Sequence, residues 1–312
     1  MRVTERTGRS LGLGAAVAAL ALLATACNGE GGGVATGPQD GDPAGQEISI
    51  GMIPWEEDIA VTNLWKVVLE EKGYDVTIEN VDVAPLYEGM AGGDVDLFLD
   101  TWLPDTHGDY WEQYQDQLED IGTWYDEATL ELTVPSYVED VDSIADLQGR
   151  EDEFGGEIVG IEAGSGLVRT VKENAIPGYG LEDYQLVESS TAAMLTELES
   201  AINAEEPIVV TLWRPHIAYA QYDLKDLEDP EGLMGEGEQI HMVGRSGFGA
   251  DFPELNGWLQ NFRLTDEQLG ELEQSVLVDH EDDEEEGARA WLRENPGFLE
   301  EVMGEDAADL SF

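Results

Sequence analysis

The stretch DVDLFLDTWLPDTH, residues 94–107, predicts a buried strand over residues 94–99 and a following loop that carries Trp102 and His107. Apolar and polar residues alternate in its first half, which is typical of a strand. Pro104 lacks the N–H that pairing between strands needs, so we expect no strand beyond it. Ligands of open α/β sheets bind beyond the carboxyl ends of the strands. Trp102 and His107 are therefore candidate ligand-binding residues.

Two further apolar runs end on a tryptophan in the same manner. They are IGMIPW at residues 50–55 and PIVVTLW at residues 207–213. A single tryptophan on a loop more often packs on the core than binds a ligand, because large aromatic side chains are mostly buried. The recurrence of this ending in three strands favours a ligand-binding role for Trp55, Trp102 and Trp213.

Strand-like and helix-like segments alternate along most of the chain and predict an α/β fold. A first set covers residues 47–99, and a second set follows a strand-like crossover at 130–135. We expect a return strand at 239–243, and we assign the helical segment from Pro253 onward to the first lobe. The predicted lobes are residues 47–130 with 243–312, and residues 131–242.

Residues 1–26 have the pattern of a secretory signal peptide, with arginines before an apolar run. The segment LATAC at 23–27 resembles the end of a bacterial lipoprotein signal, although Ala24 stands where such signals usually carry leucine. Cys27 is the only cysteine of the sequence, so it cannot form a disulfide within the chain, and lipidation gives it a role. An ordinary signal peptide with a chance cysteine is the alternative.

Cleavage before Cys27 predicts an exported protein held by lipid on the outer face of the cytoplasmic membrane. Residues 27–46 are rich in glycine, proline, aspartate and alanine without periodicity, which suits a flexible, lipid-anchored linker. No later run reaches the roughly 18 apolar residues of a transmembrane helix. We therefore expect membrane contact through the lipid anchor only.

The composition is strongly acidic, with 69 acidic residues against 14 basic ones and a formal charge of −55. Nucleic acid and anionic membrane surfaces are poor partners for such a chain, because both repel it. The excess of acids suggests a halophilic protein, since at about 1 M salt the Debye length falls to ~3 Å and self-repulsion is screened. The acidic run at 281–286 lacks the spacing and the turn glycine of a calcium loop, so no metal ion is expected.

The sequence lacks the common motifs of catalysis. It contains no His-Glu-x-x-His, no Gly-x-Ser-x-Gly and no phosphate-binding loop. With Cys27 assigned to the lipid anchor, the folded body has no thiol nucleophile. The histidines, at positions 107, 216, 241 and 280, are not at metal-ligand spacings. A binding protein without cofactors is favoured, and a secreted hydrolase is a remote alternative.

The segment IVGIEAGSGLV at residues 158–168 reads as a strand, a glycine-rich turn and the start of a helix. Such a turn directs free backbone N–H groups and the positive end of a helix dipole toward an anion. A turn of this kind that binds nothing is the alternative. Together with the tryptophans, the segment indicates a ligand that carries both a cation and an anion.

Several segments resemble the glycine betaine/proline betaine-binding proteins of compatible-solute ABC importers. They are IPWEEDIA (53–60), DTWLPDTH (100–107), GSGL (164–167), SSTAAM (189–194) and LWRPH (212–216). The resemblance covers residues 47 to about 270. It implies a two-lobed, periplasmic-binding-protein-like (type II) fold with a ligand cleft between the lobes, and an ABC permease as partner.

By motif, the resemblance also implies the binding residues for a quaternary-ammonium solute. They are Trp55, Trp102 and Trp213 around the ammonium, and Gly166, Leu167 and His107 at the carboxylate. A trimethylammonium group has no N–H to donate, whereas each indole face attracts it by ~0.5–2 kcal/mol once it is desolvated.

Two neighbours of these residues leave alternatives open. Glu57 stands where choline binders similar to this family carry an acid, so a choline or carnitine receptor is the alternative ligand class. His107 and the Gly166 amide favour a carboxylate ligand instead. His216 is expected to support its loop more than to touch the ligand.

Overall fold

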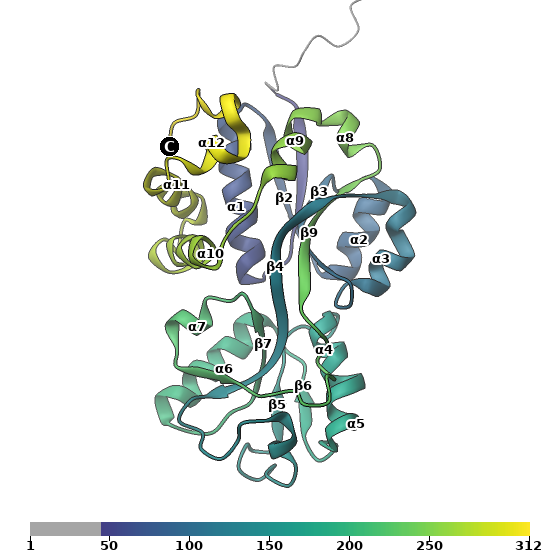
Figure 1. Ribbon diagram of the computed structural model, residues 1–312, viewed down its shortest axis with the longest axis vertical. Coiled ribbons are helices and arrows are strands. Elements are labelled where there is room, and N and C mark those ends of the chain that lie inside the picture. Colours follow the sequence, from purple (N-terminus) through teal and green to yellow (C-terminus); the bar gives the residue numbers. More distant parts are fainter. Residues whose placement is uncertain (1–44) are drawn as a thin grey trace, which may run out of the picture. The chain divides into compact units, whose positions relative to one another are not determined.

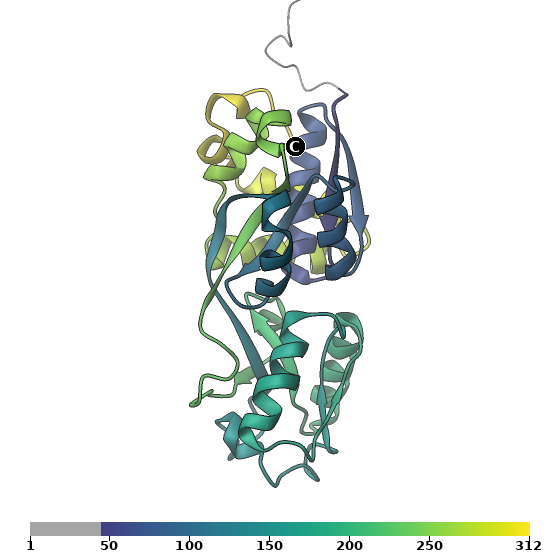
Figure 2. The ribbon, with the colours of Figure 1, turned by 90° about the vertical axis from the view of Figure 1, so that its right-hand side faces the viewer.

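The computed structural model describes residues 45–312. The predicted signal peptide, Cys27 and nearly all of the predicted linker lie outside this part of the chain. Within it, two lobes each contain a sheet flanked by helices, and two strands run between them (Figures 1 and 2). No helix among the described residues has the length and apolar character needed to cross a membrane.

The first lobe is built on parallel strands with one antiparallel neighbour. Its sheet has the order β2-β1-β3-β9-β4, in which β1 pairs parallel with both β2 and β3, and β9 pairs antiparallel with β3 and β4. The strands are β1 (Glu47–Met52), β2 (Asp75–Asn80), β3 (Leu97–Leu103), β4 (Leu118–Pro135) and β9 (Glu238–Arg245).

Helix α1 (Glu56–Glu71) positions part of the binding site at its first turn. It begins directly after Trp55, and its first three residues are acidic, which suits the positive end of the helix dipole. A face that includes Val61, Leu64 and Trp65 is buried in the core. The helix ends at Glu71 with Lys72 as its cap, and the following Gly73 takes the left-handed backbone conformation that often closes a helix.

The remaining helices of the first lobe come from both ends of the chain. α10 and α11 pack against α1, which supports the proposed assignment of the C-terminal segment to this lobe (Figure 1). The helices are α2 (Val83–Gly92), α3 (Gly108–Tyr114), α8 (Phe248–Asp251), α9 (Pro253–Asn261), α10 (Asp266–Glu273), α11 (Glu284–Glu294) and α12 (Phe298–Met303).

The second lobe holds the sheet order β4-β7-β5-β6, and β8 pairs antiparallel with the last three residues of β4, 133–135. β5 pairs parallel with β6 and β7. Its elements are β5 (Glu157–Val159), α4 (Gly166–Thr170), α5 (Ile176–Tyr179), β6 (Gln185–Val187), α6 (Thr191–Ala204), β7 (Val210–Arg214), α7 (Ala218–Gln221) and β8 (Leu224–Asp226).

The long strand β4 connects the two lobes. Its residues up to Ala128 pair with β9, and from Thr129 onward they pair with β7, so the change of partner lies close to the predicted boundary at 130. β9 pairs with β4 from Glu238 onward. This pairing favours a return boundary before that residue rather than at 242/243, because a strand belongs with the sheet that it completes. The division into lobes otherwise stays a prediction.

Strand β3 differs from its prediction. It begins at Leu97 rather than at residue 94 and runs to Leu103, so Trp102 lies in the strand and not on the following loop. Six of its seven residues are buried, including Asp100. The expected alternation is absent because β3 lies between β1 and β9 with helices packed over the sheet, which buries both of its faces.

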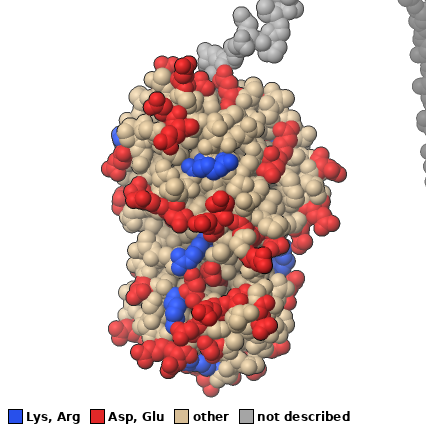
Figure 3. Space-filling model, viewed as in Figure 1, with Lys and Arg blue, Asp and Glu red and all other residues tan. Residues whose placement is uncertain are grey.

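The surface follows the composition. Acidic side chains are spread over much of the face in Figure 3, and few lysines or arginines interrupt them. Among the described residues, no group of histidine, cysteine, aspartate and glutamate side chains is arranged to hold a metal ion.

Candidate ligand-binding site

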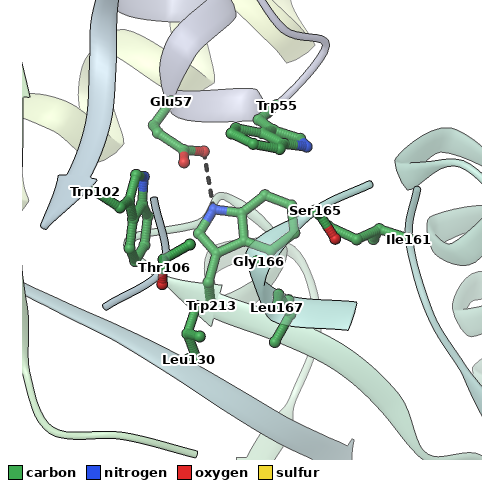
Figure 4. A pocket seen from close by; sticks show the side chains of 10 residues that line it. All are labelled: Trp55, Glu57, Trp102, Thr106, Leu130, Ile161, Ser165, Gly166, Leu167 and Trp213. Atoms are coloured by element: carbon green, nitrogen blue, oxygen red, sulfur yellow. Dashed lines mark hydrogen bonds between the residues drawn. The ribbon is translucent and has the colours of Figure 1, made fainter. Parts of the chain in front are cut away.

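A pocket between the two lobes brings together most of the predicted site residues (Figure 4). Its lining residues are Trp55, Glu57, Trp102, Thr106, Leu130, Ile161, Ser165, Gly166, Leu167 and Trp213.

Three indoles form one end of the pocket, which we call the cage end. Trp55 precedes α1, Trp102 lies in β3 and Trp213 lies in β7, so two come from the first lobe and one from the second. Their side chains and the Glu57 carboxylate converge on the same space (Figure 4). Their exposed fractions are only 6%, 3% and 3%, so a cation between them would be largely desolvated.

Each of the three indole N–H groups donates to a different carboxylate. Trp55 Nε1 lies 3.4 Å from Glu162 Oε2, and Trp102 Nε1 lies 3.0 Å from Asp100 Oδ1. Trp213 Nε1 lies 2.9 Å from Glu57 Oε2, the bond dashed in Figure 4. The polar edge of every ring is thereby satisfied, and the ring faces stay available for a ligand.

The first-lobe wall of the cage end contains buried acids. Burial, followed by the charge of Asp100, raises the pKa of Glu57 well above its usual range, and burial with the charge of Asp58 does the same for Asp100. Burial also raises the pKa of Asp58 to about 7, although the Ile53 N–H donates to it at 2.7 Å. Protons are therefore retained in this wall at pH values where an exposed carboxylate has lost them.

Two oxygens in this wall have no hydrogen-bond partner among residues 45–312. They are Glu57 Oε1 and Asp100 Oδ2, and both are buried. An unpartnered buried oxygen lowers the stability of the folded state, because it has lost its hydrogen bonds to water and has gained none in return. Glu57 lines the pocket, so its free oxygen is available to a bound solute.

His107 lies beside the cage and does not line the pocket. Its Nδ1 accepts a hydrogen bond from the Trp102 backbone N–H at 2.9 Å, so the ring proton of the neutral form is on Nε2. The ring stacks on Trp55, with 5.6 Å between the centroids and 12° between the planes. Burial and the charge of Arg169 lower the pKa of His107 to about 3, so the ring is neutral near pH 7. Its buried Nε2 has no partner in the described part of the chain.

The other end of the pocket, which we call the amide end, is a turn between β5 and α4. Ser165 caps the helix, and its Oγ accepts a hydrogen bond from the Val168 N–H at 3.2 Å. Gly166 and Leu167 occupy the first two helical positions, where backbone N–H groups have no acceptor within the helix. Both residues line the pocket, so two backbone donors are available there.

Gly166 also lies directly against the first lobe. A Cβ atom at this position would lie 2.3 Å from the Thr106 carbonyl oxygen of the first lobe. Such a distance is far inside van der Waals contact, and the obstacle is backbone. Any larger residue would therefore push the lobes apart.

Comparison with known proteins identifies the family. The model of a family described as the substrate binding domain of ABC-type glycine betaine transport systems matches residues 46–294. The chain belongs to this family. It is accordingly a substrate-binding receptor of an ABC transport system and not an enzyme.

Two solved structures and one further relative are similar to this receptor. ProX, the glycine/betaine/L-proline-binding protein of Borrelia burgdorferi, is 32% identical with a TM-score of 0.79, over 84% of this chain and 98% of that one. Lactococcal OpuAC, closed and complexed with glycine betaine, is 30% identical with a TM-score of 0.76, over 83% and 99%. These likenesses confirm the two-lobed type II fold.

The third similar protein is the glycine betaine/carnitine transport binding protein GbuC of Listeria monocytogenes. It is 41% identical over 143 residues, which are 45% of this chain and 46% of GbuC. The chain therefore aligns with less than half of that relative.

Further contacts of the receptor join its lobes outside the pocket. Arg169 of α4 donates to the Thr106 carbonyl at 3.1 Å and lies 3.3 Å from the Asp109 carboxylate. His216 does not line the pocket. Its Nδ1 accepts from the Ala218 N–H at 2.9 Å, and its Nε2 lies 3.2 Å from the Glu56 carboxylate, which fits the expected supporting position.

The sequence analysis did not find two of the three carboxylates that accept hydrogen bonds from the indoles, those of Asp100 and Glu162. Asp100 could have been found, because side chains two residues apart in a strand share a face and Trp102 is its partner. Glu162 gave no such signal, since its bond to Trp55 joins residues of different lobes. The contributions of Thr106, Leu130 and Ile161 likewise arise only when the lobes meet.

Proposed function

We propose that the receptor binds glycine betaine, or a related quaternary-ammonium zwitterion, and delivers it to an ABC permease for osmoprotection. The observation that carries the proposal is the pocket with three indoles at one end and two backbone donors at the other. A betaine has a trimethylammonium group and a carboxylate, so it matches both ends at once.

The cage end suits an ammonium group that has no N–H. Such a group cannot form directional hydrogen bonds, and the faces of Trp55, Trp102 and Trp213 attract it by ~0.5–2 kcal/mol each when water is excluded. Burial of the methyl groups adds a hydrophobic contribution. Because the rings come from both lobes, the cage around the ammonium group is complete only after the lobes close on the ligand.

The amide end suits the carboxylate. The N–H groups of Gly166 and Leu167 at the start of a helical run would donate charge-assisted hydrogen bonds to it. His107 is proposed as a third donor, because its unpartnered Nε2 carries the ring proton. This contact requires a small shift, since the ring lies beside the pocket rather than on its wall.

A calorimetric panel of glycine betaine, proline betaine, carnitine, choline and proline tests the proposal. The betaines are expected to bind with micromolar to low-millimolar Kd. Proline is expected to bind at least about tenfold more weakly, because its ammonium lacks methyl groups to fill the cage. Equal affinity for proline and glycine betaine would show that the cage does not select for a quaternary ammonium group.

A choline receptor is the second candidate, and the unpartnered Oε1 of Glu57 favours it. Glu57 lines the pocket, and its free oxygen could pair with the choline hydroxyl. If choline binds more tightly than glycine betaine, and Glu57→Gln abolishes that preference, this candidate replaces the first. The betaine proposal instead requires His107→Ala to weaken betaines more than choline, because both ligands lose the support that His107 gives to Trp55 and Trp102 and only the betaines lose a donor to a carboxylate.

We also propose that the receptor is a lipoprotein, exported by residues 1–26 and anchored through Cys27, both of which lie outside the described residues. The LATAC segment supports this location. Two acyl chains on the cysteine are enough for stable anchoring. Cys27→Ser should release the protein into the medium, as measured by fractionation of cells, whereas continued membrane association would count against the anchor.

A further inference from the structure

Behind the cage, the indole N–H groups of Trp55 and Trp102 end on the carboxylates of Glu162 and Asp100. We propose that Glu162 and Asp100 are positioning residues of the cage: each fixes the plane of one indole, and Glu162 in addition strengthens the preference for a cation. The proposal rests on the proposed function, because it assumes that a quaternary ammonium occupies the cage.

Asp100 and Trp102 form a pair within one strand. They lie two residues apart in β3, and both side chains are buried. The 3.0 Å bond between Trp102 Nε1 and Asp100 Oδ1 therefore does not depend on how the lobes are arranged. It fixes the Trp102 ring before any ligand arrives, which removes an ordering cost from binding.

Glu162 and Trp55 form a pair between the lobes. Glu162 follows β5, and its carboxylate accepts hydrogen bonds from the Thr191 backbone N–H at 2.9 Å and from the Thr191 hydroxyl at 3.1 Å. These bonds hold the carboxylate at the start of α6 in the second lobe. Its Oε2 reaches Trp55 Nε1 of the first lobe at 3.4 Å. The bond forms only when the lobes meet, so it contributes in the state that holds the ligand.

The charge of Glu162 acts through the ring that it touches. A negative charge at the indole N–H adds to the negative potential of the ring face, and a cation over that face gains from it while a neutral group of the same shape does not. Asp100 differs, because its complete burial favours the uncharged form, so its contribution is the orientation of Trp102. Loss of the Glu162 charge should therefore weaken only cationic ligands, whereas loss of the Asp100 hydrogen bond should weaken cationic and neutral ligands equally.

Pairs of ligands that differ only in charge separate these contributions. In 3,3-dimethylbutan-1-ol, a carbon atom replaces the choline nitrogen, and in 3,3-dimethylbutanoate, a carbon atom replaces the betaine nitrogen. Binding of all four compounds is measured by calorimetry and by tryptophan fluorescence. The variants are Glu162→Gln, which keeps an acceptor oxygen without the charge, and Glu162→Met, which removes both. Glu182→Gln removes one charge from an exposed position of the same lobe and serves as the control.

For Glu162→Gln we expect the cationic ligands to bind about threefold to tenfold more weakly and the alcohol to bind as in the wild type. Glu162→Met is expected to weaken the uncharged ligands as well, because the Trp55 ring is released, and to weaken the cationic ligands more, because they also lose the effect of the charge. Glu182→Gln should match the wild type for every ligand. Asp100→Asn should stay within about twofold of the wild type, whereas Asp100→Leu should weaken both kinds of ligand.

The proposal is overturned if Glu162→Gln weakens the binding of the cation and of its neutral isostere equally, or weakens neither. In that case the proposed binding of quaternary-ammonium solutes still stands. Where the isosteres bind too weakly to titrate, the order of glycine betaine affinity decides: it must fall from wild type to Glu162→Gln to Glu162→Met, with Glu182→Gln unchanged. A wild-type protein that binds no quaternary-ammonium compound overturns the proposed function, and this inference with it.

Discussion

The two ends of the pocket are built in different ways. The amide end consists of consecutive residues, Ser165 to Leu167, whose geometry follows from one turn and one helix start. The cage end collects Trp55, Trp102 and Trp213 from distant segments and from both lobes. One end exists within a single lobe, whereas the other exists only when the lobes meet, so changes at the two ends should have different consequences.

The largest effect is expected from the second-lobe member of the cage. Trp213→Ala should weaken glycine betaine by about 3 kcal/mol, because it removes a cation–π contact and apolar surface and leaves Glu57 without its indole donor. Trp213→Phe keeps a ring face and should cost less. Calorimetry measures both, with thermal unfolding as the check that the variants fold. A loss smaller than about twofold for Trp213→Ala would mean that the cage functions without the second lobe.

At the amide end, Gly166→Ala should weaken glycine betaine by about 2 kcal/mol, since the added methyl group meets the Thr106 backbone and forces the lobes apart. Gly164→Ala is the matched control in the same turn. Its Cβ would meet only a side-chain atom of Val83 at 3.9 Å, an ordinary contact, so binding should be unchanged. Unchanged binding in Gly166→Ala would show that close approach of the lobes is not needed.

The pH dependence of glycine betaine affinity also distinguishes the two ends of the pocket. Glu57, which faces Asp100, Glu273 and Trp213, has a raised pKa in the empty site, as does Asp100, which faces Asp58. A cation in the cage favours the ionised form of Glu57, which lines the pocket, so binding releases a proton and affinity falls as the pH falls below the raised pKa of Glu57.

Between about pH 8 and pH 5 we expect glycine betaine affinity to fall about threefold to tenfold, with a weaker dependence in Glu57→Gln. The amide end should contribute nothing in this window, because the pKa of His107, about 3, keeps that ring neutral. Calorimetry in buffers of different ionisation enthalpy measures the released protons directly. Affinity that rises as the pH falls would contradict the sign.

The smallest effect on binding is expected from salt. The exposed carboxylates repel one another, so the Tm should rise between about 0.1 M and 2 M KCl as the charges are screened. The acids of the cage end are buried, and a zwitterion has no net charge, so the Kd for glycine betaine should change by less than about twofold. Sulfate is excluded from the test, because it also strengthens apolar burial. A constant Tm would argue against adaptation to salt.

The sequence predicted the amide end well because that end is local. The strand β5, the glycine-rich turn and the helix start at Ser165 are all contained in residues 157–168. The three tryptophans were recognised because the same ending recurs in three apolar runs. In both cases short-range patterns carried the information.

The acids behind the cage escaped prediction for a physical reason. Among 69 acidic residues, the few that are buried do not differ in type from those in solvent, so composition offers no contrast. Only the packing around β3 removes Asp100 from water, and only the meeting of the lobes brings Glu162 to Trp55. The same packing explains the error at β3, where Asp100 suggested an exposed face that the fold does not have.

The path of the chain through β4 and β9 has a consequence for synthesis. The second lobe lies between these two strands in the sequence, so its strands are complete once Asp226 has been made. The sheet of the first lobe still lacks β9 at that moment and waits for Glu238–Arg245, which pairs with both β3 and β4. Although its residues emerge first, the N-terminal lobe is the one that must finish last.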